Sequence, residues 1–554
     1  MNESANTTPT IRQWEEAGTA LANATKKYLE FSQSLEAKCL AEGVSPGHLA
    51  AQIDSALKSL HAVLDQQIAE ARSTLTLSRN KIVSPVYRLP EEVLSQIFMD
   101  ALYGYSDIPD VDESRVVDYY RRLHHLIGVC SAWKNVIVSR GVFWSIVPMI
   151  YSGFWALKTE RATRLSLERA QERPLHLTAH LSFYAYDRVS EYASRFRTVN
   201  ISTRDNSNEV MRRLLHDIIF PGTPEPLSLS QLSLCHIYDA PYYSRLPLES
   251  DYIMRNCFPE HRFNVVVNNL AILRIRGAQF YWDHISFSHH LTELHLQDVL
   301  VGYDTSLMNL FGALSSAAQL RDLKLIGIKA FPVRNTLVGR YISLPSLKTL
   351  LLRDLYFNVL AICLSTITSR SHHLTLFLNR KCRCLNLLGN NQSQDIDIHA
   401  LNRLLYNASV HTLFLDGGRE YGWLPAVHLR NLLSSTAYLD TLWINKWDLD
   451  ADSCFALRSV SHPQVIPNLK ELSFVQTRVR SEQAFKNLVI SRSESIQLLR
   501  IGVEFVNEAG VPFNESNIGL SKWLQENVSN PSVIEINADD EPYELKEVEW
   551  RMWS

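Results

Sequence analysis

The feature that most constrains the fold is a six-residue pattern, Leu-x-x-Leu-x-Leu or a close variant, that recurs from about residue 160 onward. The commonest distance between copies is 27 to 30 residues. Nine copies are near-regular, and they begin at Leu229, Leu270, Leu291, Leu320, Leu347, Val410, Leu439, Leu469 and Ile496. One such hexamer is common in any leucine-rich chain, but nine at near-constant spacing are not. We therefore interpret residues 160–554 as an array of repeated units.

Each unit is expected to form one short strand followed by a return segment. Alternate strand residues face the same side of a sheet, so the Leu-x-Leu core of each hexamer places two side chains on one inward face. Stacked units build a parallel sheet with a continuous core behind it. The array resembles leucine-rich repeats, which implies an α/β chain with an irregular solenoid of parallel strands.

The position three residues after each hexamer departs from the leucine-rich-repeat pattern. Many such repeats carry an Asn or Cys there, which hydrogen-bonds the loop backbone. In this chain the position is usually another residue, as at Ile237, Ala278, Val299, Ile328 and Leu355. We expect the polar ladder inside the turns to be missing, and the repeats to be irregular in length and curvature.

A second informative stretch is the sequence Arg-Leu-Pro-Glu-Glu-Val-Leu-Ser-Gln-Ile-Phe at residues 88–98. Pro90 suits the first turn of a helix, and the acidic residues after it suit the positive helix end. Apolar residues then repeat at three- and four-residue spacing on one side of that helix: Val93, Leu94, Ile97 and Phe98. A short helix with so broad an apolar face must bury it against something.

A second block, about thirty residues later, contains Val129, Cys130, Trp133, Phe143 and Trp144. Together the two blocks resemble an F-box, the adaptor-binding motif of substrate receptors in cullin-type ubiquitin ligases. Ser131 stands where the family usually has a basic residue, and an acidic insertion at about residues 104–120 separates the two halves. The alternative is an ordinary helical subdomain at residues 89–144 that folds onto its own neighbours.

The resemblance implies a three-helix F-box-like domain at residues 85–150 that binds a Skp-type adaptor and, through it, a cullin scaffold. It assigns ten residues to adaptor binding or to holding the fold of this domain: Leu89, Pro90, Val93, Leu94, Ile97, Phe98, Val129, Cys130, Trp133 and Trp144. The solenoid would then bind a target protein, whose identity one sequence does not reveal.

Residues 1–84 are interpreted as a helical lead-in. Two helical segments, 11–42 and 48–84, flank a Gly- and Pro-containing break at residues 43–47. In the second segment Ile53, Leu57, Leu60 and Leu64 follow coiled-coil spacing, which weakens at Gln67 and recovers at Ala71 and Leu75. The two segments could form an antiparallel hairpin or pack on the next domain, or the second could dimerise with another copy. Fewer than three clean heptads favour the first two possibilities.

The composition is that of a globular protein, with 46% hydrophobic and 20% charged residues in 554. A formal net charge of −3 provides no overall field for nucleic acid or anionic membrane. The eight cysteines show no paired framework, and the start lacks the pattern of a secretion signal. The longest uncharged stretch, residues 141–157, is shorter than a membrane-spanning helix needs. We expect a soluble protein of the cytoplasm or nucleus.

Catalytic and cofactor motifs are not found. There is no phosphate loop, dinucleotide fingerprint, nucleophile elbow or kinase signature. The histidine pair 372–373 with Cys382 and Cys384 has the right donor types for zinc. However, Cys-x-Cys is tighter than the usual spacing, and adjacent histidines in a strand point to opposite faces. We therefore predict no catalytic residue, metal or cofactor.

Aromatic side chains near the strands and their following loops are candidate anchors for a target protein. The four best candidates for an exposed position are Tyr281, Trp282, Trp443 and Trp447. The alternative is that such residues fill the core of irregular repeats.

The order of these segments predicts a non-catalytic substrate-recognition subunit of an SCF-type ubiquitin ligase. Binding alone would raise the effective concentration of target lysines near the conjugating enzyme. One rival is a leucine-rich interaction scaffold that is not coupled to ubiquitination. The other is an enzyme with an unrecognised site on the rim of the solenoid.

Overall fold

The structure is a computed structural model, and it divides the chain into two compact units, residues 1–96 and 97–554, each of which is described by itself. The described residues are 8–83, 85–103, 113–150, 156–181, 189–203, 208–219, 227–237, 246–248, 251–253, 260–282, 285–333, 341–367, 372–389, 393–458, 468–507, 516–528 and 532–535.

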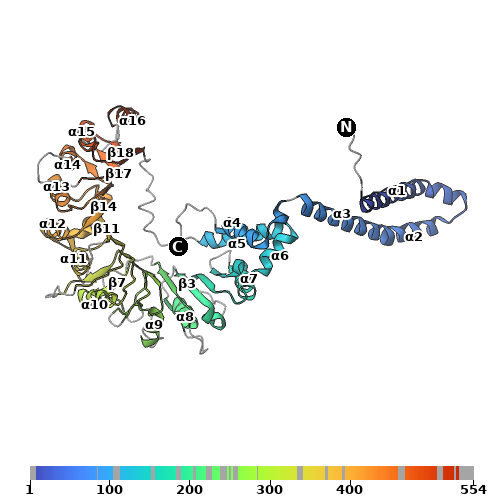
Figure 1. Ribbon diagram of the computed structural model, residues 1–554, viewed down its shortest axis with the longest axis horizontal. Helices are drawn as coiled ribbons and strands as arrows, with labels where there is room; N and C mark the ends of the chain where they lie inside the picture. The colour runs from blue at the N-terminus through green and yellow to red at the C-terminus, as the bar shows by residue number, and fades with distance from the viewer. Residues whose placement is uncertain are drawn as a thin grey trace. The chain divides into compact units, whose positions relative to one another are not determined.

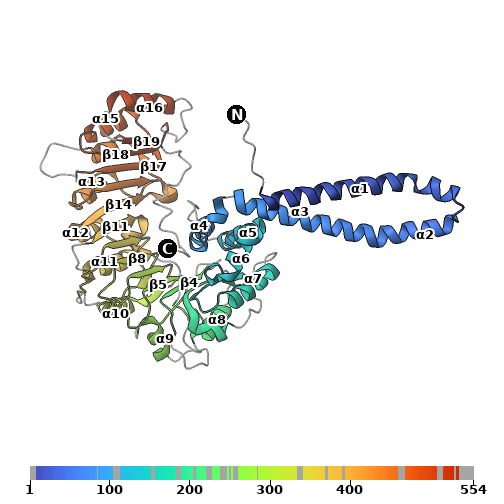
Figure 2. The ribbon, with the colours of Figure 1, turned by 45° about the vertical axis from the view of Figure 1, so that its right-hand side comes forward.

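The first unit is a helical hairpin. Helix α1 (Pro9–Ala41) ends before Gly43, whose φ of +80° suits glycine. Helix α2 (Pro46–Ala56) starts with a Ser45 cap and continues through a π-helical turn (Leu57–His61) into α3 (Ala62–Val83). The two arms run side by side (Figure 2), and the Tyr28 hydroxyl lies 3.1 Å from Nε2 of His61. The structure thus has the antiparallel hairpin.

The unit boundary falls within helix α4 (Glu91–Tyr103), which follows a 3₁₀ turn (Pro85–Arg88). Two further helices, α5 (Glu113–Val129) and α6 (Ser131–Ser139), precede a 3₁₀ turn (Gly141–Trp144). The second half of the acidic insertion therefore belongs to a helix, whereas residues 104–112 lie outside the described part of the chain. Tyr119 and Tyr120 of α5 donate hydrogen bonds to the carbonyls of Phe143 and Ile146, at 3.1 and 2.6 Å.

The main element of the second unit is a 15-stranded sheet in which all strand pairs are parallel. Its strands, in spatial order, are β1 (Ile146–Ile150), β2 (Leu175–Leu181), β3 (Phe196–Thr203), β4 (Gln231–His236), β5 (Ile272–Arg276), β6 (Glu293–Gln297), β8 (Asp322–Ile326), β10 (Thr349–Arg353), β11 (His373–Leu378), β14 (Val410–Asp416), β15 (Thr441–Asn445), β17 (Glu471–Val479), β18 (Leu498–Phe505) and β19 (Ser532–Glu535), with β16 (Asp448–Leu449) against β17.

Return helices cover the outer side of this sheet (Figure 1). They are α7 (Ala156–Arg169), α8 (Asn208–Ile219), α9 (Glu260–Val267), α10 (Asp304–Leu314), α11 (Phe357–Thr366), α12 (Ile398–Tyr406), α13 (Ala426–Ser434), α14 (Ala451–Leu457), α15 (Glu482–Arg492) and α16 (Ser516–Asn527). Two small sheets pair β7 (Leu300–Tyr303) with β9 (Lys329–Phe331) and β12 (Cys384–Asn386) with β13 (Ser393–Asp395). No helix among the described residues has both the length and the apolar content needed to cross a bilayer.

The repeated leucines form the core because the strands pair in register. Leu294 of β6 aligns with Leu323 of β8, which aligns with Leu350 of β10, and all three are at most 1% exposed. The structure therefore confirms a mixed α/β chain with N-terminal helices and a long parallel sheet.

The turns after the strands explain the apolar residues that replace Asn or Cys. The residue directly after the strand has a positive φ at Gly277, Asp298, Gly327, Asp354 and Lys446. At Gly277, Asp298 and Gly327 the N–H of this residue donates to the carbonyl of the last residue of the next strand, for example from Asp298 to Ile326 at 2.8 Å. The side chain of the following residue then points into the core between the sheet and the return helices, and Ala278, Val299 and Ile328 are fully buried. Backbone hydrogen bonds thus connect these consecutive turns.

Candidate functional site

The F-box-like residues fall into a buried and an exposed group. Leu94, Phe98 and Trp144 are at most 7% exposed, whereas Val93 and Ile97 are 43% and 46% exposed. The exposed group also contains Leu89, Pro90 and Val129, and Cys130 and Trp133 are partly buried.

The buried group holds the helices of this segment together. The Phe98 ring lies 4.7 Å from the Trp133 ring and 6.3 Å from the Phe143 ring, measured between centroids. The indole of Trp144 donates a 2.9 Å hydrogen bond to the Ile137 carbonyl. Trp144 and Phe98 are therefore core residues and do not offer a contact surface.

The exposed group leaves an apolar strip on helix α4. Val93 and Ile97 are four residues apart, so they lie one above the other on the same face. Leu89, at 36% exposure, precedes them by one turn, and Glu91 and Glu92 occupy the first turn of the helix. Large apolar side chains at this spacing form a surface that a partner helix or groove can cover. We call Leu89, Val93 and Ile97 the α4 strip.

A cluster of aromatic side chains lies on the face of the sheet that is opposite to the repeated leucines. We call this face, which the return helices do not cover, the inner face. Phe377, Phe414 and Trp443 lie in register on adjacent strands β11, β14 and β15. The first two rings stack at 4.0 Å and 3°, and the last two stack at 5.3 Å and 18°. Ile326, Val475 and partly buried Leu351 pack against this aromatic row.

Two guanidinium groups lie over the ends of the aromatic row. Arg353 lies 5.1 Å from the Phe377 centroid, and Arg500 lies 4.8 Å from the Trp443 centroid. Such cation–π contacts stabilise by about 0.5–2 kcal/mol, more where water is excluded. The three rings are 2–8% exposed, so the row stiffens the inner face more than it offers contact area.

The inner face is polar on the strands that precede the aromatic row. Arg274 of β5 forms a two-pronged ion pair with Glu293 of β6, at 2.7 and 2.9 Å. His295 lies nearby and is 3% exposed. Burial, with Lys324 and Arg274 adding to it, lowers the pKa of His295 to about 3. The imidazole is therefore neutral at physiological pH.

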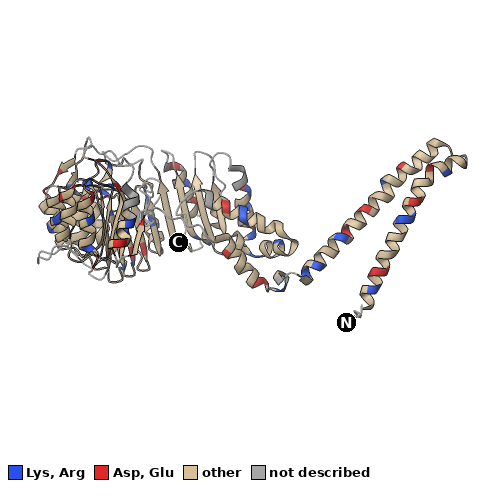
Figure 3. Cartoon of the chain, turned by 90° about the horizontal axis from the view of Figure 1, so that it is seen from above, with Lys and Arg blue, Asp and Glu red and all other residues tan. Residues whose placement is uncertain are grey.

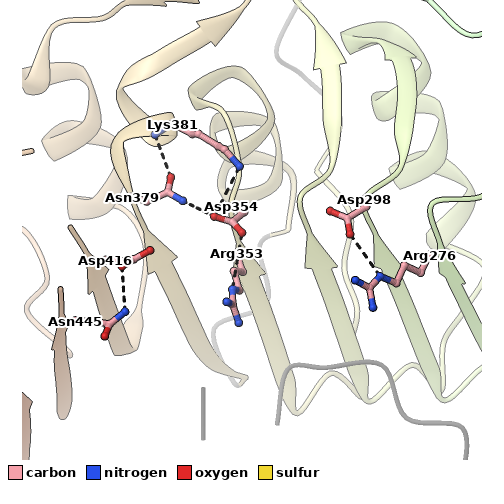
Figure 4. Close-up of polar contacts among 8 residues, drawn as sticks. All are labelled: Arg276, Asp298, Arg353, Asp354, Asn379, Lys381, Asp416 and Asn445. Atoms are coloured by element: carbon pink, nitrogen blue, oxygen red, sulfur yellow. Dashed lines mark hydrogen bonds and ion pairs between the residues drawn. The ribbon is translucent and has the colours of Figure 1, made fainter. Parts of the chain in front are cut away.

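Charged and amide side chains also gather at the carboxyl ends of the strands (Figure 4). Arg276 lies 3.5 Å from Asp298, and Lys381 lies 3.9 Å from Asp354, which also accepts a hydrogen bond from Asn379. Farther along the same edge, Asn445 donates to Asp416 at 3.0 Å.

Burial shifts the pKa values of two charged side chains at this edge. It raises the pKa of Asp298, which Arg276 partly offsets, and it lowers the pKa of Lys329 to about 8, with Lys381 adding to the effect. Cations and anions alternate here, so these groups largely neutralise one another. Their contacts hold the conformations of the turns that follow the strands.

The predicted target-binding residues lie at different depths. Trp282, Trp443 and Trp447 are each 2% exposed, and Tyr281 is partly buried, with its ring stacked on Tyr252 at 4.0 Å. The expected exposure of the three tryptophans is therefore wrong. Trp447 occupies the inward position after a turn residue, the position of Ala278 and Val299 in other repeats.

Sequence reasoning missed the aromatic row, although a signal was present. Phe414 lies between Leu413 and Leu415, and Trp443 lies between Leu442 and Ile444. Because strand side chains alternate, a residue between two core leucines faces the other side of the sheet. Bulky aromatics at this place in consecutive repeats predict a stacked row.

Three buried cysteines of the solenoid have weakly acidic thiols. Burial raises the pKa of Cys363 and Cys382, and it raises the pKa of Cys454 to about 12. These thiols hold their protons at neutral pH and are poor nucleophiles. Within the described ranges, no three His, Cys, Asp or Glu side chains are placed to hold a metal ion.

Comparisons with known proteins do not assign the chain to a family. No protein-family model matches the chain, and no curated protein matches it. One similar solved structure is a chain of an octameric complex of Latrophilin 3, Unc5D and the leucine-rich-repeat protein FLRT2, at 14% identity and a TM-score of 0.24. It covers 55% of this chain and 90% of its own length.

Another similar structure is a leucine-rich-repeat protein of Leptospira interrogans, at 10% identity and a TM-score of 0.19. The alignment covers 69% of this chain and 99% of that one. Since both TM-scores are this low, the solenoid assignment depends on the strands, register and turns described above.

Proposed function

We propose that this chain is the substrate-recognition subunit of an SCF-type ubiquitin ligase, which binds a Skp-type adaptor through helix α4 and a target protein through the solenoid. The observation that carries the proposal is the division of the F-box-like residues. Phe98 and Trp144 are used in the core, while Val93 and Ile97 of the α4 strip stay exposed.

This division is what an adaptor-docking helix requires. An ordinary helical subdomain would bury its apolar positions internally. Helix α4 leaves Val93 and Ile97 at 43% and 46% exposure, and Leu89 just before it is 36% exposed. Burial of a large apolar side chain contributes about 1.5–3 kcal/mol, so half-exposed Val93 and Ile97 would each contribute about 1 kcal/mol when covered.

On the solenoid, exposed apolar residues of successive return helices are the candidate target contacts. Tyr406 of α12, Val427 of α13 and Phe455 of α14 are 76%, 69% and 52% exposed. They offer contact area that the buried tryptophans do not. Holding a target beside the conjugating enzyme requires no nucleophile or metal on this chain, because proximity supplies the rate enhancement.

The test is co-purification of a Skp-type adaptor with wild-type chain and with the double variant Val93→Glu/Ile97→Glu. We expect the variant to lose the adaptor, because two carboxylates would have to be buried. The matched control is Val265→Glu/Ile490→Glu, which places the same charges at apolar positions of α9 and α15 with 58% and 47% exposure.

The control should retain the adaptor, and both variants should keep the circular dichroism of the wild type. Failure of the wild type to bind the adaptor, or equal binding by the α4 variant, would contradict the proposal. A reconstituted ubiquitination assay with co-purified proteins then separates a receptor from an uncoupled scaffold, since a scaffold would bind the adaptor and yield no modified protein.

A further inference from the structure

The N-terminal hairpin has almost no core of its own. Within residues 8–83 the only buried residue is Leu49, and neither α1 nor α3 contains a buried residue. Helices gain most of their stability in water from packing of an apolar face. A pair of long helices that buries so little needs a further partner.

Helix α1 presents its apolar residues as a regular stripe. Trp14, Leu21, Tyr28 and Leu35 follow one another at seven-residue intervals and are 57%, 51%, 41% and 37% exposed. A seven-residue repeat keeps side chains on one face of a helix that supercoils with its neighbours. The fold of the hairpin thus leaves a coiled-coil stripe largely uncovered.

The second arm carries a matching stripe with one irregular step. Ile53 and Leu60 are seven residues apart, as are Ile68, Leu75 and Ile82, but eight residues separate Leu60 from Ile68. The π-helical turn at Leu57–His61 contains Leu60, where this step begins, and accommodates one extra residue. The pattern that weakens at Gln67 in the sequence is therefore restored at Ile68, and these five residues are 38–69% exposed.

The uncovered area is of the size that a stable interface buries. At about 170 Å² for a large apolar side chain, the nine stripe residues expose on the order of 700 Å² per copy. A standard protein interface covers about 800 Å² on each partner.

The charge of the hairpin favours a second copy of this chain as the partner. Residues 9–83 contain eight Lys and Arg residues and eight Asp and Glu residues, so the segment has no net charge. Both signs are interspersed along both arms (Figure 3). Two copies would therefore meet without net repulsion and could pair opposite charges beside the apolar seam, as coiled-coil partners do.

We propose that the chain forms a homodimer in which two hairpins pack their apolar stripes together as a four-helix bundle. This inference is independent of adaptor binding. The dimer would carry two α4 strips and two solenoids, and so would bind its partners bivalently.

The test is the molar mass of the full chain in solution, measured by light scattering at micromolar concentration. Wild type should have twice the mass of one chain. Two variants place like charges on the stripes, one with Leu21→Glu/Leu75→Glu and one with Leu21→Lys/Leu75→Lys. Each variant alone should have the mass of one chain, while Val265→Glu/Ile490→Glu should remain dimeric.

A mixture of the acidic and basic variants distinguishes a lost interface from an unfolded hairpin. Opposite charges on the two stripes should restore a heterodimer, which an unfolded segment would not form. A monomeric wild type, a dimeric single variant or a mixture that stays monomeric would each overturn the proposal.

Discussion

The turn after strand β5 provides a sharp test of the repeat architecture. Gly277 has a φ of +67°, and a Cβ at this position would lie 2.0 Å from the His236 carbonyl oxygen. The left-handed conformation costs about 1–2 kcal/mol for a residue with a side chain. The shift that relieves the clash would also weaken the 2.9 Å bond from the Gly277 N–H to the Gln297 carbonyl, at about 0.5–1.5 kcal/mol. We expect Gly277→Ala to destabilise this region by about 1.5–3.5 kcal/mol.

The matched control is Gly312→Ala in helix α10. A Cβ there meets no atom within 4 Å, so alanine should stabilise the helix by about 0.5–1 kcal/mol. Hydrogen exchange of peptides that cover β5 and β6 measures the local effect, with β17 and β18 as an internal reference, because repeats contact mainly their neighbours. Equal protection in Gly277→Ala and wild type, or equal effects of the two substitutions, would refute the proposed role of this turn.

Three further predictions concern the solenoid. Lys446→Gly should raise the free energy of unfolding by up to about 1 kcal/mol, because Lys446 has a φ of +50°. The measurement is a higher midpoint in urea unfolding, and a lower midpoint would contradict the prediction. Phe414→Ala should lower the free energy of unfolding in urea by about 3–5 kcal/mol, because the Phe414 ring is 4% exposed. Phe455→Ala should lower it by less than about 1 kcal/mol, because that ring is 52% exposed, and similar losses for the two variants would exclude a packed aromatic row. His295 has a pKa of about 3 in the folded chain and about 6.5 in the unfolded chain, so between pH 3 and pH 6.5 it takes up a proton on unfolding. The free energy of unfolding should therefore fall as the pH drops below about 6.5, by up to about 2 kcal/mol at pH 5. His295→Gln should remove this contribution, and an unchanged difference in unfolding free energy between pH 7 and pH 5 would count against it.

The repeats were predictable because the spacing of their leucines indicates both the length of each repeat and the face of each strand that is buried. Leu294, Leu323 and Leu350 align across the sheet as their hexamers require. The depth of individual aromatics was harder to predict. The sequence places Trp447 in the loop after a strand, which does not predict burial. Its burial follows from the left-handed conformation of Lys446, which points the next side chain into the core.

The α4 segment shows the same limit of sequence patterns. Spacing places Val93, Leu94, Ile97 and Phe98 on one side of a helix, but it does not show which of them the neighbouring helices cover. That division depends on tertiary contacts, such as the packing of Phe98 on Trp133. The hairpin stripe depends likewise on a π-helical turn, which no spacing rule for regular helices anticipates.

The most direct test of the central claim is a calorimetric titration of the full chain with a purified Skp-type adaptor. The proposal predicts saturable binding by wild type and an affinity at least about 30-fold lower for Val93→Glu/Ile97→Glu, since losing about 2 kcal/mol at the two positions corresponds to this factor. Absence of binding by the folded wild-type chain, or equal affinity of the two proteins, would contradict the assignment of α4 as the adaptor-binding helix.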